Sequence, residues 1–227
     1  QQMNGETPDA AAGVWKDAER RAGEARRTTE RVGKRVLLSW SGGRESALAL
    51  DALSRDPAVA VVGLLTSVTS SYDRISVHGV RRSMLQAQVE RLGLPLFEIT
   101  LPARCTNDEY EAASRDALGE NSRKLRDVAQ IPFGAPVTGD VPAKRERWLA
   151  VTGWAQPLSI WGLDTRSLAR RFIADGFVAR LVCVDTTQLD AAFAGRVFDE
   201  GLLADLPVTV DPCGERGEFH TFVSEGP

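Results

Sequence analysis

The sequence predicts an α/β fold with a parallel sheet, and two observations lead to this class. From Arg35 onward, short apolar runs alternate with segments whose apolar residues recur at helical spacing. The first run, residues 36–38, is apolar throughout, as expected of a strand buried on both faces of a parallel sheet. Ligands of such open sheets bind beyond the carboxyl ends of the strands, so the loops at those ends are the first candidates for a site.

Each expected element follows from a local pattern. The strand at 36–38 leads through a Ser/Gly loop into a helix rich in alanine and leucine. Residues 78–92 are expected to form a helix that stops at Gly93. Thr106 and Glu109 have the spacing of a capping box, which starts a helix that runs to about residue 118. The other expected elements are strands at 59–65, 94–101, 158–161, 178–184 and 218–223, and an amphipathic helix around Leu168, Phe172 and Ile173.

Length and composition fit a globular enzyme. The chain has 227 residues, 43% hydrophobic and 26% charged, which is enough for one large or two small domains. No apolar stretch approaches the roughly 20 residues of a membrane span, and the N-terminus lacks the apolar core of a signal peptide. A cytoplasmic protein without membrane contact is therefore expected. The net charge of -3 argues against a large nucleic-acid footprint.

The cysteine and histidine counts argue against two kinds of site. Cys105, Cys183 and Cys213 are odd in number and widely spaced, so neither a disulfide framework nor a C-x-x-C metal site is indicated. Cys183 lies in an apolar run and is expected to be a buried structural thiol. His78 and His220 are the two histidines of the chain, too few for a His-built zinc site.

Residues 1–34 differ in composition from the rest of the chain. They are rich in Ala, Glu and Arg and contain few large apolar side chains. Such a segment is expected to be a solvated helix or a disordered polar arm, because it has little apolar surface to bury. It takes no part in the argument about the site.

The loop of residues 41–46, Ser-Gly-Gly-Arg-Glu-Ser, has the features of a phosphate cradle. Gly42 and Gly43 allow close approach of the backbone to a ligand, and the helix that follows offers unpaired N–H groups and a positive dipole end. Arg44 and the two serine hydroxyls add donors for phosphate oxygens. Neither the G-x-x-x-x-G-K-[ST] pattern nor the G-x-G-x-x-G pattern occurs at this strand end. An ordinary strand-turn-helix with a Gly-Gly turn is the alternative.

A second cluster of reactive residue types lies at 211–223. Glu218 and His220 fall on one face if 218–223 is a strand, so they are expected to act together on the substrate as carboxylate and base. Cys213 could be a nucleophile. A Gly-rich hairpin with solvated charges, in which these side chains are purely structural, is the alternative.

The loop at 41–46 resembles the S-G-G-K-D-S loop of the PP-loop ATP pyrophosphatases, and the chain as a whole resembles the bacterial branch of their diphthine ammonia-ligase-like family. The resemblance runs in consistent order from residue 35 to 227. It is carried by Leu38 to Gly43 with Glu45 and Ser46, by His78 to Arg82, Gly93 to Leu96, Glu109 to Glu111, Phe133 and Gly134, Arg145 and Glu146, Pro157, Leu158 and Trp161, and by the tail C-G-E-R-G-E-F-H-T-F-V.

The resemblance implies a HUP-type, Rossmann-like nucleotide domain at 35–140 and a smaller C-terminal α/β substrate domain at 141–227. It also implies ATP and Mg²⁺ as cofactors, with the metal held by the ATP phosphates and Asp140 as a candidate ligand. The residues that it assigns to ATP and its phosphates are Ser39, Ser41, Gly42, Gly43, Arg44, Glu45, Ser46, Thr66 and Gly134. Those that it assigns to substrate are His78, Arg82, Asp140, Cys213, Gly214 and Glu215, with Arg44, Glu218 and His220 as catalytic residues.

Three positions depart from the family pattern. Arg44 stands where the family has Lys, and Glu45 where it has Asp. The sign of each charge is kept, but the arginine side chain is a planar fork rather than a point charge. Ala135 replaces the Asp of the family's Phe-Gly-Asp loop, and Asp140 follows a few residues later as a candidate replacement.

The activity implied is adenylation followed by amide formation. A carboxylate or amide oxygen of the substrate, a small molecule or a modified residue, attacks the α-phosphate of ATP, pyrophosphate leaves, and ammonia or another amine displaces AMP. A homodimer is left open as the oligomeric state. Two other functions stay open: an adenine-nucleotide-binding protein without catalysis, and a PP-loop tRNA thiolase that uses Cys105 and Cys213.

Overall fold

The computed structural model describes residues 33–76, 78–131 and 164–227, and in this part of the chain the fold is a mixed α/β arrangement. Its main sheet has four parallel strands in the order β4-β2-β1-β5. They are β1 (Lys34–Ser39), β2 (Val59–Thr69), β4 (Leu96–Leu101) and β5 (Val128–Gln130). A short strand, β3 (Arg74–Ile75), pairs antiparallel with the end of β2 and makes the sheet mixed.

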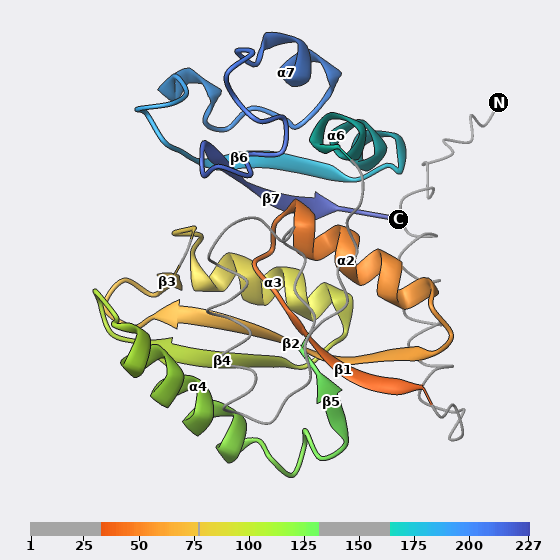
Figure 1. Cartoon of the computed structure of the whole chain (residues 1–227), viewed down its shortest axis with the longest axis vertical. Helices are drawn as coiled ribbons and strands as arrows, with labels where there is room; N and C mark the ends of the chain where they lie inside the picture. The colour runs from red at the N-terminus through yellow and green to blue at the C-terminus, as the bar shows by residue number, and fades with distance from the viewer. Residues whose placement is uncertain (1–32, 77, 132–163) are drawn as a thin grey trace, which may run out of the picture.

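Helices cover both faces of this sheet (Figure 1). One face carries α2 (Arg44–Arg55) and α3 (Arg82–Leu92), and the other carries α4 (Asn107–Glu120). Leu37 of β1 and Ile99 of β4 pack with Leu118 of α4 in one buried cluster. Apolar side chains are thus needed on both faces of the strands, which is why the strand sequences show little alternation.

The C-terminal segment forms a second, smaller layer beyond α2 and α3 (Figure 1). It contains α6 (Thr165–Ala174), β6 (Val178–Val184), the 3-10 turn η1 (Ala191–Phe193), α7 (Glu200–Asp205) and β7 (Phe219–Glu225). Strands β6 and β7 pair antiparallel. One buried cluster includes Leu48 of α2, Phe172 of α6 and Val223 of β7, so the two layers share a continuous hydrophobic core.

Local signals placed several elements correctly. Thr106 and Glu109 form the expected capping box at the start of α4, with the Thr106 hydroxyl accepting from the Glu109 amide at 3.3 Å. Gly93 ends α3 in the left-handed region, at φ 64°. Strand β6 has the bounds expected from the sequence, and α6 carries Leu168 and Phe172 on its buried side.

Other expectations need correction. Strand β2 continues to Thr69 instead of ending at residue 65, because β4 pairs with it as far as Thr69. Helix α3 begins at Arg82 and not at His78. Cys183 is exposed and not buried, because the β6–β7 register shifts between Leu181 and Cys183. The strand expected at 158–161 lies outside the described residues.

In the described ranges, no helix is both long enough and apolar enough to cross a membrane.

Candidate active site

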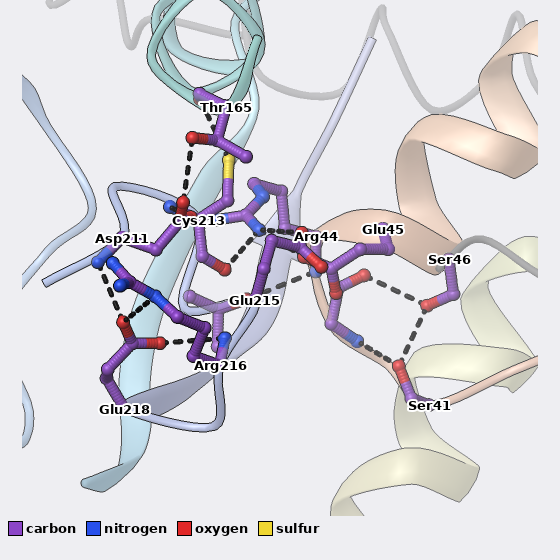
Figure 2. A network of polar contacts seen from close by, with 12 residues as sticks. Ser41, Arg44, Glu45, Ser46, Thr165, Asp211, Cys213, Glu215, Arg216 and Glu218 are labelled. Atoms are coloured by element: carbon purple, nitrogen blue, oxygen red, sulfur yellow. Dashed lines mark hydrogen bonds and ion pairs between the residues drawn. The ribbon is translucent and has the colours of Figure 1, made fainter. Parts of the chain in front are cut away.

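The loop between β1 and α2 is held in shape by its own hydroxyl groups. The Ser41 hydroxyl accepts a hydrogen bond from the Gly43 amide at 3.2 Å. The Ser46 hydroxyl donates to the Gly43 carbonyl at 2.9 Å and lies 3.3 Å from the Ser41 oxygen (Figure 2). The loop follows the carboxyl end of β1, which ends at Ser39, the place at which ligands bind in open α/β sheets.

Strand β7 of the C-terminal layer lies directly on this loop. The Val223 amide donates to the Gly42 carbonyl at 2.9 Å, and the Arg44 amide donates to the Thr221 hydroxyl at 3.1 Å. Gln88 of α3 joins the two segments, because its side-chain nitrogen donates to the carbonyls of Gly42 at 3.1 Å and Val223 at 2.6 Å. The candidate site is thus formed by three segments that are distant in sequence: the 41–46 loop, α3 and β7.

The Arg44 side chain turns away from the loop and enters the C-terminal layer. It is fully buried, and its Nη2 donates to the Cys213 carbonyl at 2.6 Å. It is paired with the carboxylates of Glu45 and, at 3.6 Å, Glu215. Its guanidinium carbon lies 5.1 Å from the centroid of the Phe198 ring, a cation–π distance. Burial opposes the charge, but the adjacent carboxylates, Glu45 above all, outweigh it and raise the Arg44 pKa.

The segment that receives Arg44 is the tail loop, which we define as residues 211–217. Asp211 accepts hydrogen bonds from the Cys213 amide at 2.7 Å and from the Thr165 hydroxyl at 2.9 Å. The thiol of Cys213 donates to the Thr165 carbonyl at 3.0 Å. These bonds anchor the tail loop to the start of α6 (Figure 2).

Glu218 closes the tail loop. Its side chain is 1% exposed, and its two oxygens accept from the amides of Asp211 at 2.8 Å and Arg216 at 2.9 Å. Arg216 Nε also lies 3.3 Å from the carboxylate. Strand β7 begins one residue later, at Phe219, so Glu218 lies just before the strand that carries His220. The Glu218 carboxylate is bonded to the tail loop, and its joint action with His220 on a substrate stays a prediction.

Residues 164–227 match the family model described as the diphthamide synthase C-terminal domain. The match supports a diphthine ammonia-ligase-like family and an enzyme-type domain for this segment. It covers α6, β6, α7, the tail loop and β7, which is the part of the chain that packs on the 41–46 loop. No curated protein matches the chain.

His220, in the segment that matches the diphthamide synthase C-terminal domain, lies in a half-buried stack. Its ring lies parallel to that of His78, with centroids 3.2 Å apart. Burial, assisted by the charge of Arg44, lowers the His220 pKa to about 3, so the imidazole is neutral near pH 7. Its Nε2 is buried and has no hydrogen-bond partner. A base with so low a pKa is a weak proton acceptor at neutral pH.

Glu215 of the tail loop has a raised pKa. Burial and the nearby charge of Glu45 raise its pKa to about 7. Its Oε1 atom is buried and accepts no hydrogen bond. By contrast, burial raises the pKa of the Cys213 thiol to about 12, which leaves that sulfur protonated and unreactive.

The remaining expected site residues are spread over the fold. Arg82 donates from Nε to Glu98 at 2.9 Å and lies 3.6 Å from Asp73, so its charge is already paired. Thr66 is buried within β2 rather than in a loop after it. Gly214 adopts a φ of 66° in the tail loop. Gly134, Ala135 and Asp140 lie outside the described residues.

Three contacts of the site could not be found by reading the sequence. Gln88 lies on α3 between Ala87 and Val89, and the carbonyls that it bonds are 46 and 135 residues away. Phe198 looks like an ordinary core residue, yet its ring carries the Arg44 guanidinium. Thr221 stood inside the tail motif, but only its bond to the Arg44 amide distinguishes it.

The described side chains do not fit a built metal site. In the described ranges no group of three or more His, Cys, Asp or Glu residues is arranged to hold a metal ion. Arg44 also pairs with the side chains of Glu45 and Glu215, so its positive charge already occupies the position between them that a metal ion would need.

Proposed function

We propose that this protein is an ATP-dependent amide-forming ligase that converts ATP to AMP and pyrophosphate, as the diphthine ammonia-ligase-like family does. The observation that carries the proposal is the bonding of the matched domain to the 41–46 loop. Thr221 accepts from the Arg44 amide, and the Val223 amide donates to Gly42. A substrate carried by the C-terminal layer would therefore lie next to a nucleotide carried by the loop.

The proposed reaction has two steps. A carboxylate oxygen of the acceptor, a small molecule or a modified residue, attacks the α-phosphorus of ATP, and the bond to the β-phosphate oxygen breaks to release pyrophosphate. Ammonia then attacks the acyl carbon, the bond to AMP breaks, and the surplus protons pass to solvent. The first turn of α2 and the hydroxyls of Ser41 and Ser46 supply donors and a positive dipole end for the departing pyrophosphate.

Mg²⁺ would reach this site with the nucleotide. Because the described residues offer no metal site of their own, the phosphates of ATP would supply most of its ligands. We propose a HUP-type, Rossmann-like nucleotide domain for the parallel sheet, and the cytoplasm as the location.

Binding of pyrophosphate at the loop requires a local rearrangement. His220 covers the open side of Gly43: a methyl group placed on Gly43 would lie 2.6 Å from the His220 ring. The amides of Gly43 and Arg44 already donate to Ser41 and Thr221. We therefore propose that the phosphates displace the His220 ring from Gly43.

A nucleotide-binding protein without turnover is the second candidate. It is favoured by the orientation of Arg44, which is fully buried and bonded to Cys213 instead of facing the loop. The thiolase alternative loses support, because the Cys213 thiol has a pKa near 12 and donates to Thr165.

The decisive experiment is incubation of the pure protein with α-labelled ATP, Mg²⁺, ammonium and a pool of carboxylate metabolites. We expect AMP and pyrophosphate. Formation of ADP would contradict the proposal, and tight binding without turnover would favour the second candidate. Ser46→Ala should reduce AMP formation by at least roughly tenfold, since it removes a donor at the phosphate loop. Ser54→Ala, on an exposed part of the same helix, is the matched control.

A further inference from the structure

Glu218 is 1% exposed, and every other Asp and Glu in the described ranges is more exposed than this. A buried carboxylate is costly unless its oxygens accept hydrogen bonds, and both Glu218 oxygens accept from backbone amides. The two donors, Asp211 and Arg216, lie at opposite ends of the tail loop. Glu218 therefore fixes the distance between those ends and with it the shape of the loop.

The tail loop in turn determines where Arg44 points. The Cys213 carbonyl and the Glu215 carboxylate both belong to this loop, and both face the Arg44 guanidinium (Figure 2). Arg44 has no access to water, so these groups and Glu45 define its electrostatic surroundings. Both Glu218 oxygens are bonded within the tail loop, and the side chain is 1% exposed, so it does not face an open substrate site.

We propose that Glu218 is a positioning residue that orients Arg44, and through Arg44 the 41–46 loop, by holding the tail loop in shape. The chain of contacts runs from Glu218 to the amides of Asp211 and Arg216, then through Cys213 to Arg44. The role of these contacts in catalysis rests on the proposed function, because they affect catalysis only if the 41–46 loop binds ATP. The contact chain itself is independent of that proposal.

The first test uses the Nε–H signal of Arg44 in ¹⁵N-labelled protein, assigned through its loss in Arg44→Lys. Glu218→Gln offers one acceptor oxygen where the carboxylate offers two, and its amide group faces the second donor. We expect the Arg44 signal to shift and the exchange of the Arg44 backbone amide to rise at least roughly tenfold. Arg216→Ala removes the exposed ion-pair partner and leaves both amide bonds, so it should leave the signal in place.

A general loss of stability could also change the Arg44 signal and its amide exchange, so a destabilised control variant is needed. Thr106→Ala removes the cap of α4 on the opposite face of the sheet and serves as the destabilised control. Its Arg44 signal should match that of the unmodified protein. A Glu218→Gln effect confined to residues 211–218, with the Arg44 signal and amide unchanged, would overturn the proposal, as would an equal effect in the control.

Arg44→Lys tests the coupling between Arg44 and the tail loop by changing Arg44 instead of Glu218. It keeps the proposal testable if Glu218→Gln fails to fold. Coupling between two sites is reciprocal, so loss of the guanidinium should raise exchange at the Asp211 and Arg216 amides by roughly tenfold. Unchanged exchange there would also overturn the proposal. Calorimetry with α,β-methylene-ATP separates the two ideas: if the analogue does not bind, the proposed function fails while the exchange data still decide the role of Glu218.

Discussion

The His220 imidazole lies against the backbone of Gly43, so that a Cβ atom on Gly43 would stand 2.6 Å from His220 Cε1 and 2.9 Å from the Thr221 carbonyl oxygen. Gly43 has an ordinary extended conformation, with φ at -92°. Glycine is therefore required here by the close approach of β7 and not by backbone strain.

The first prediction concerns this contact. Gly43→Ala should destabilise the protein by about 1–3 kcal/mol, the usual cost of overpacking, because the added methyl group pushes against a ring and a main-chain carbonyl. Urea unfolding measures the change. Gly119→Ala in α4 is the control: nothing lies within 4 Å of its added Cβ, so it should stabilise the helix by about 0.5–1 kcal/mol. Equal stability of the two variants would show that β7 does not pack on the loop.

The second prediction follows from the raised pKa of Glu215, about 7 in the folded protein against an ordinary value of 4.5. The folded state keeps a proton that the unfolded state has released, so stability is full below pH 4.5 and falls as the pH rises to 7. Between pH 5 and 7 the loss should be roughly 2 kcal/mol relative to Glu215→Gln, which cannot titrate. Parallel stability curves for the two proteins would contradict the raised pKa.

The third prediction has the opposite sign. The pKa of His220 is lowered to about 3 from 6.5, so the stability that its neutral form provides is complete above pH 6.5 and is lost as the pH falls. From pH 6.5 to 5 the unmodified protein should lose roughly 2 kcal/mol relative to His220→Phe, which keeps a ring beside His78. Chemical denaturation at several pH values tests this, and a titration of His220 near pH 6.5 by NMR would refute it.

The fourth prediction concerns the thiols. Cys183 is exposed, whereas Cys213 is buried, donates to Thr165 and has a pKa near 12. A disulfide reagent at pH 8 should modify Cys183 at least roughly a hundredfold faster than Cys213, because the thiolate is the reactive form. Mass spectrometry of the labelled peptides distinguishes the sites, with Cys183→Ser as the control. Fast labelling of Cys213 in folded protein would restore the thiolase alternative.

Local sequence patterns determined much of the fold. The capping box at Thr106 and Glu109 and the glycine stop at Gly93 act within one helical turn, so the neighbouring residues suffice to predict them. The Ser/Gly loop at 41–46 was located in the same way, since its glycines and hydroxyls are adjacent in the chain. The match of residues 164–227 to the diphthamide synthase C-terminal domain agrees with the tail motif read from the sequence.

Only the tertiary structure decided what the charged residues of these motifs contact. Arg44 was expected to face phosphate, yet its carbonyl partner at Cys213 lies 169 residues further along the chain. Glu218 was expected to act with His220, but β7 begins after it and two amides occupy its oxygens. The burial of these side chains depends on how the C-terminal layer packs against α2, and this packing sets both their direction and their pKa. Neither the direction nor the pKa can be read from the spacing of residues along the sequence.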